Sequence, residues 1–67
     1  MENEILLHVM GMKKKNEDEI TTEIARMPGV ELVQVNAQQG TVSVTGGDLD
    51  QLQVVDIIES LGYTTLH

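Results

Sequence analysis

The sequence contains no cysteine. This excludes disulfide bonds, thiolate metal ligands, a cysteine nucleophile and dithiol redox chemistry, all of which need a cysteine sulfur. Tryptophan and phenylalanine are also missing, and Tyr63 is the only aromatic residue. A hydrophobic core in this chain must therefore be built from valine, leucine, isoleucine, methionine and alanine.

Long apolar segments are missing as well. No apolar run in the sequence approaches the roughly 18 residues that a membrane span needs, and the chain opens without a basic and then apolar leader. We therefore expect a cytoplasmic protein with no membrane insertion. A length of 67 residues supports a single domain over residues 1–67. That length leaves little room for an enclosed pocket, and no glycine-rich phosphate loop is present, so we do not expect an enzyme.

Positive charge is scarce. Four lysine and arginine residues stand against eleven aspartate and glutamate residues, which gives a net charge of −7. Three of the four cations are consecutive, Lys13, Lys14 and Lys15, so this segment carries +3 and the rest of the chain carries −10. An acidic chain is a poor ligand for nucleic acid, and RNA-binding sheets normally also carry aromatic residues. We expect no nucleic-acid partner.

Alternating and helical hydrophobic patterns divide the chain into six elements. Strand patterns cover residues 3–10, 30–37, 40–46 and 63–67, and helical patterns cover residues 16–27 and 48–61. The order is β-α-β-β-α-β with short connections. With right-handed crossovers, this order predicts an α+β, ferredoxin-like sandwich in which a four-stranded antiparallel sheet carries both helices on one face.

Capping residues mark where the helices should begin. Asn16 is the predicted N-cap of the first helix, with Glu19 three residues later completing a capping box. Asp48 is the predicted N-cap of the second helix, with Gln51 in the same role. The buried stripe of the second helix is expected to consist of Leu52, Val55, Ile58 and Leu61.

Four short motifs follow one another along the chain. They are Val9-Met10-Gly11-Met12, Met27-Pro28-Gly29-Val30, Gly40-Thr41-Val42-x-Val44 and Ile58-Glu59-x-x-Gly62-Tyr63. In this order they resemble the heavy-metal-associated domain of copper chaperones and metal-pumping ATPases. The resemblance spans residues 5–66, and it implies the same ferredoxin-like fold and a role in metal trafficking.

The resemblance also implies where a metal site would lie. In that family the loop after Gly-Met carries Cys-x-x-Cys, whose two thiolates hold and exchange a soft ion such as Cu(I). Counted forward from Gly-Met, the cysteine positions fall on Lys14 and Glu17; counted back from Ile20, they fall on Lys13 and Asn16. Neither register gives a thiolate. We therefore expect a domain that has lost thiolate metal binding.

Four other side chains are weak candidates for metal ligands, namely His8, Met12, Glu17 and His67. Alternation directs His8 to the open face of the sheet, and a last strand beside the first would bring His67 near it. Such a pair lacks the third protein ligand that zinc sites usually supply, and methionine is more often a core residue. We expect no cofactor, with a weakly bound transition metal as the alternative.

Three functions remain open at this point. The first is a non-enzymatic accessory module that binds a protein partner, such as a metal ATPase, a chaperone or another copy of itself. Its interaction loop would consist of Lys13, Lys14, Lys15 and Tyr63. The second is a metal carrier that uses the non-cysteine ligands above. The third is a small-ligand regulatory domain of similar fold.

Overall fold

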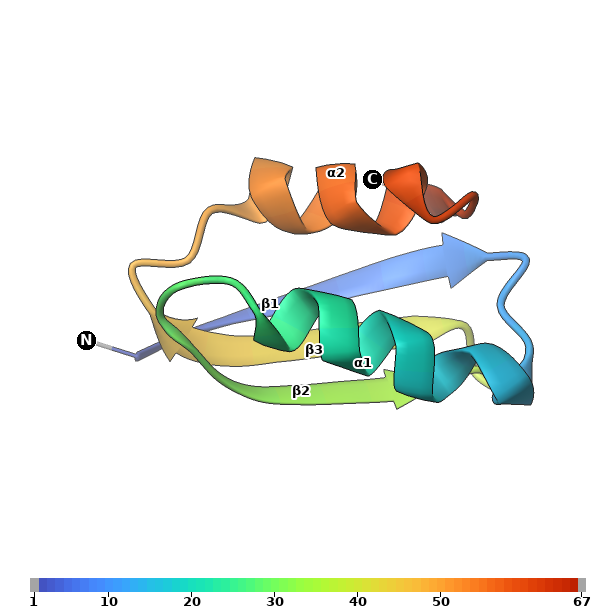
Figure 1. The fold of residues 1–67 in the computed structure, drawn as a ribbon, viewed down its shortest axis with the longest axis horizontal. Coiled ribbons are helices and arrows are strands. Elements are labelled where there is room, and N and C mark those ends of the chain that lie inside the picture. Colours follow the sequence, from blue (N-terminus) through green and yellow to red (C-terminus); the bar gives the residue numbers. More distant parts are fainter. Residues whose placement is uncertain (1, 67) are drawn as a thin grey trace.

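The computed structural model describes residues 2–66 (Figure 1). The strands are β1 (Glu2–Met10), β2 (Val30–Asn36), β3 (Thr41–Gly47) and β4 (Thr64–Leu66); the helices are α1 (Glu17–Ala25) and α2 (Gln51–Ser60), with a short 3-10 turn, η1, at Lys14–Asn16. The strands form one antiparallel sheet in the order β2-β3-β1-β4. Both helices cover the same face of this sheet (Figure 1). The predicted ferredoxin-like fold is confirmed.

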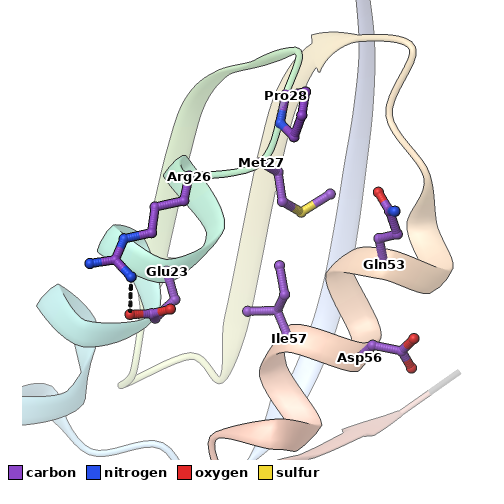
Figure 2. Close-up of a pocket in the computed structure, with 7 residues that line it drawn as sticks. All are labelled: Glu23, Arg26, Met27, Pro28, Gln53, Asp56 and Ile57. Carbon is purple, nitrogen blue, oxygen red and sulfur yellow. Dashed lines mark ion pairs between the residues drawn. The ribbon is translucent and has the colours of Figure 1, made fainter.

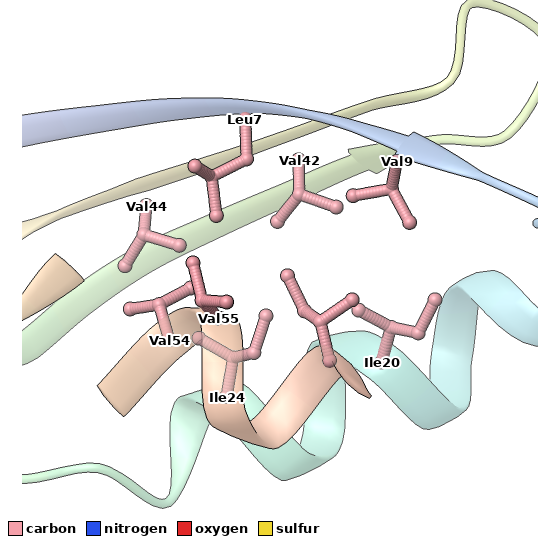
Figure 3. Close-up of a cluster of buried hydrophobic side chains, with 9 residues drawn as sticks. Leu7, Val9, Ile20, Ile24, Val42, Val44, Val54 and Val55 are labelled. Atoms are coloured by element: carbon pink, nitrogen blue, oxygen red, sulfur yellow. The ribbon is translucent and has the colours of Figure 1, made fainter. Parts of the chain in front are cut away.

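The core lies between the sheet and the two helices (Figure 3). It is aliphatic, as the composition requires, and its nine buried side chains are Leu7, Val9, Ile20, Ile24, Val42, Val44, Val54, Val55 and Ile58. Strand β3 shows the alternation most clearly, because Val42 and Val44 are buried while the residues beside them are partly exposed. Each fully buried side chain of this kind contributes about 1.5–3 kcal/mol. The helix-covered face of the sheet therefore holds the fold together.

Helix α2 begins two residues later than the predicted N-cap implies. Its N-cap is Asp50, which has an extended backbone and whose side chain accepts a hydrogen bond from the N–H of Leu52 at 3.0 Å. The predicted cap, Asp48, has a φ of 55°, and this left-handed conformation does not lead directly into a right-handed helix. The side chains of α2 that face the core are Val54, Val55 and Ile58, and at 3.6 residues per turn Leu52 lies off this face and is 71% exposed. The expectation that Leu52 is buried was therefore wrong.

Helix α1 is also shorter than predicted, and ends at Ala25 instead of residue 27. The chain then turns through Gly29, whose φ is 88°. The N–H of Gly47 donates to the carbonyl of Gly29 at 3.0 Å, and a Cβ on Gly46 would collide with that same carbonyl. Only glycine fits this close backbone approach, which fixes one end of the sheet.

Candidate functional site

The loop between β1 and α1 lies at the other end of the sheet from this glycine contact (Figure 1). Gly11 ends β1 with a φ of 88°, a conformation that favours glycine. Met12 follows and packs, partly buried, against the core. Lys13 and η1 then lead into α1. The loop is therefore anchored at Met12, and its remaining residues lie towards solvent.

Asn16 occupies the N-cap position of α1, as predicted, but its side chain closes this loop and makes no capping bond to the helix. Its side-chain Oδ1 accepts a hydrogen bond from the N–H of Lys13 at 3.1 Å, and its own N–H donates to the carbonyl of Lys13 at 2.8 Å. The predicted capping box of Asn16 with Glu19 was wrong, because Asn16 has helical backbone angles and makes no side-chain cap bond. An N-cap residue needs a non-helical backbone to aim its side chain at the first turn. Lys13 and Asn16, one candidate pair of cysteine positions, are thus joined to each other.

Glu17 joins the loop to the turn between β2 and β3. Its Oε2 accepts a hydrogen bond from the N–H of Ala37 at 2.9 Å, in a partly buried setting. The bond lies beside a hollow of about 430 Å³ that Met12, Lys14 and the hairpin turn also line. The two residues are 20 positions apart, and no spacing rule indicates the contact. The structural role of Glu17 is therefore not apparent from the sequence.

The three lysines of the loop are all exposed. Within residues 2–66 they form no ion pair; the ion pair found there joins Arg26 to Glu23 at 3.3 Å, at the far end of α1. The loop therefore presents three positive charges to solvent. In the same part of the chain, the first turn of α1 carries Glu17, Asp18 and Glu19, whose negative charges are favourable beside the positive end of the helix dipole.

Tyr63 lies beside the start of the loop, in the turn before β4. A methyl group added to Gly11 would lie 4.0 Å from Cδ1 of Tyr63, so the ring is close to the point where the loop begins. Burial raises the pKa of Tyr63, and the negative charge of Glu19 and a hydrogen bond to its side chain raise it further. The hydroxyl of Tyr63 is thereby associated with α1, and the ring connects the loop to the last strand.

Of the candidate metal ligands within residues 2–66, Met12 and Glu17 line the same hollow, whereas His8 lies away from them. His8 is exposed on the open face of β1, where it pairs with Thr41 on one side and Leu66 on the other. Met12 packs against the core on the opposite side of the sheet, and His67 lies outside the described residues. Within residues 2–66, no three histidine, aspartate or glutamate side chains gather as a metal site would require.

A second hollow, of about 460 Å³, lies between α1 and α2 (Figure 2). Met27, Pro28 and Ile57 supply its apolar surface, and the Arg26–Glu23 ion pair stands at its side. The volume falls in the range of about 300–1,000 Å³ that is usual for ligand pockets. None of the site residues expected from the sequence lines it, although Met27 and Pro28 belong to the Met27-Pro28-Gly29-Val30 motif.

Known structures share this fold. The chain aligns with a CopZ metallochaperone at 28% identity and a TM-score of 0.90, over 96% of this chain and 100% of that one. It aligns with the water-soluble region of the P-type ATPase CopA from Bacillus subtilis at 31% identity and a TM-score of 0.86, over 97% of this chain and 45% of that one. A CsoZ metallochaperone matches at a TM-score of 0.91 and 22% identity, over the whole of both chains. The architecture is thus that of small metallochaperones and of the soluble domains of metal-pumping ATPases.

The chain belongs to the heavy-metal-associated domain family, which matches over residues 15–64. The expected family relationship is confirmed. A comparison with curated proteins gave no match. Within residues 2–66, neither helix is long and apolar enough to cross a membrane.

The donors of this loop do not fit a soft metal ion as cargo. Its side chains are ammonium, amide and carboxylate groups, whereas Cu(I) prefers thiolate and thioether sulfur. Met12 supplies the loop's one thioether, and it packs against the core. The carboxylate of Glu17 already accepts a backbone hydrogen bond. The chemistry of the family's metal site is therefore not reproduced by these residues.

Proposed function

We propose that this chain is a non-enzymatic module of metal trafficking that binds a protein partner and no longer binds metal through thiolates. Its interaction loop consists of Lys13, Lys14, Lys15 and Tyr63. The observation that carries the proposal is the exposure of all three lysines on the segment where relatives in this family present metal. A cytoplasmic location, as expected from the sequence, is part of the proposal.

The partner is a protein with an acidic surface, such as a metallochaperone or the soluble domain of a metal ATPase. Charge supports this choice, because the loop carries +3 on a chain of net charge −7. An acidic surface is repelled by most of the molecule and attracted by this loop, so charge fixes the orientation of the complex. The backbone of the loop is held by Asn16 and Glu17, so little ordering is needed on binding.

The alternative of a metal carrier is less well supported. His8 and Met12 lie on opposite sides of the sheet, and the carboxylate of Glu17 is hydrogen-bonded to the hairpin. Titration with Cu(I), Zn²⁺ and Ni²⁺, followed by backbone amide shifts, separates the two functions. We expect no saturable shift within residues 10–17 or at Tyr63. Saturable shifts confined to those residues would establish a carrier and refute the loss of metal binding.

Partner binding is tested by calorimetry with the metallochaperone and the soluble ATPase domain of the same organism. Changing Lys13, Lys14 and Lys15 together to glutamine should weaken binding by roughly tenfold, if each exposed ion pair is worth about 0.2–1 kcal/mol. A pair of single variants separates the loop from net charge. Lys14→Gln removes one positive charge from the loop, and its matched control Arg26→Gln removes one at the other end of α1. Equal losses in the two single variants would show that net charge alone matters and would refute the proposed loop.

A further inference from the structure

The face of the sheet that the helices leave uncovered carries four large apolar side chains. Leu6 is 59% exposed, Met10 57%, Leu32 52% and Leu66 51%. This open face comprises the outward residues of all four strands; those described are Glu4, Leu6, His8, Met10, Leu32, Gln34, Asn36, Thr41, Ser43, Thr45, Thr64 and Leu66. Single exposed apolar residues are ordinary, but a gathered set marks an interaction surface.

Three of the four apolar residues surround His8. Leu6 and Met10 stand on either side of His8 along β1, and Leu66 is the cross-strand partner of His8 on β4. Leu66 is therefore diagonal to both, at the distance of about 7–8 Å that long side chains can bridge. Leu32 lies apart from them on β2, in the row of Thr45 and Glu4. The apolar surface is therefore concentrated at the β1–β4 side of the face.

Charge distinguishes this face from the rest of the molecule. Among its described residues the one carboxylate is Glu4, which accepts a hydrogen bond from the hydroxyl of Ser43 at 3.3 Å, and no lysine or arginine is present. The chain as a whole carries −7. Two copies approaching through their acidic helices repel each other, whereas two open faces meet with little charge between them. The occupant that this face suits is a second copy of the same chain.

The size of the face sets the strength of such a contact. The molecule measures 31 by 21 Å across the two longer axes, and Figure 1 shows the strands spread in this plane. Because these extents include the loops and helices, the open face covers at most about 650 Å² per copy, and two faces together reach no more than the low end of the roughly 1,200–2,000 Å² that specific interfaces bury. A weak, reversible dimer is expected from this area.

We infer that the open face mediates self-association as a two-fold dimer, with two sheets packed face to face. Such a contact is closed, because each copy uses the same surface and no free patch remains for a third. Sheets stacked in this way lie about 10 Å apart, which brings the apolar group at Leu6, Met10 and Leu66 out of water. The interaction loop lies at the end of the sheet (Figure 1) and stays outside this contact.

Sedimentation velocity over a concentration series tests the inference. The chain should show a monomer–dimer equilibrium, and Leu6→Lys should weaken dimerisation by about tenfold or more, because it places a charge in an apolar contact. Leu52→Lys is the matched control, since Leu52 is 71% exposed and lies on α2. It should leave the equilibrium unchanged. Circular dichroism checks that both variants fold, which the exposure of both leucines favours.

Three results would overturn the inference. One is a monomer at every concentration. Another is an equal loss of dimer in Leu6→Lys and Leu52→Lys. The third is a dimer that disappears when the three loop lysines become glutamine, because that result would assign self-association to the interaction loop. Loss of the dimer in Leu6→Lys alone leaves the proposed loop function untouched, so the two proposals fail independently.

Discussion

The hydrogen bond from the N–H of Ala37 to the carboxylate of Glu17 makes a quantitative prediction. Glu17→Ala removes an acceptor with a full charge, and such bonds contribute about 1.5–3 kcal/mol. It also removes a negative charge from the first turn of α1, worth about 0.3–1 kcal/mol. We expect the free energy of unfolding to fall by about 2–4 kcal/mol, measured by urea denaturation. For 67 residues the total is only about 3–10 kcal/mol, so the loss is large.

Asp18→Ala provides the control. Asp18 lies in the same helical turn and is exposed, so its removal should cost only the dipole contribution of about 0.3–1 kcal/mol. Glu17→Gln keeps an acceptor without the charge, so its loss of free energy of unfolding should lie between the losses of the two alanine variants. Amide exchange gives a second readout, since the N–H of Ala37 should exchange faster in Glu17→Ala than in Asp18→Ala. If the two alanine variants were equally stable, the assigned role of Glu17 would be wrong.

Two further predictions concern single residues. Tyr63 is the only tyrosine, so phenolate absorbance reports its pKa, which is raised above 10.0. The pKa should fall in Glu19→Gln, and an unchanged titration would contradict the role of Glu19. Because the raised pKa favours the neutral folded form, Tyr63 stabilises the fold below pH 10.0, and this contribution is lost as pH rises through the folded pKa. Gly46→Ala should cost about 3 kcal/mol or more in thermal unfolding, since its Cβ would meet backbone. Gly62→Ala has open space and should cost only the left-handed backbone, about 1–2 kcal/mol; equal costs would contradict the collision.

The sheet and its covered face were predictable because they depend on periodicity. The alternation in Thr41-Val42-Ser43-Val44 places both valines on one face, and the structure buries both. The order of the elements then leaves few topologies. The exposure of Leu6 and Met10 on the other face follows from the same alternation. These features need only the sequence and the rule that side chains alternate along a strand.

The helix starts and the loop contacts were not predictable in this way. Asn16 and Asp48 are both good capping residue types, but residue type does not fix the backbone angles. Asn16 stands at the N-cap of α1 without a side-chain capping bond, and Asp48 has a left-handed backbone and is not the N-cap of α2. The predicted stripe of α2 followed a spacing of three residues, which drifts around a helix of 3.6 residues per turn, so Leu52 lies off the face that buries Val54, Val55 and Ile58. The bond between Glu17 and Ala37 joins residues brought together only by the complete fold. Local signals specify helices and strands better than they specify where these begin.

The three lysines on an otherwise acidic body have a consequence for the kinetics of association. At an ionic strength of about 0.01 M the screening length is about 30 Å, close to the 31 Å length of the molecule. An acidic partner is then repelled by the net negative charge of the whole molecule. At about 0.1 M the length is about 10 Å, and a partner at the loop feels mainly the lysines. Higher salt then screens these as well. The association rate constant should therefore pass through a maximum at intermediate ionic strength.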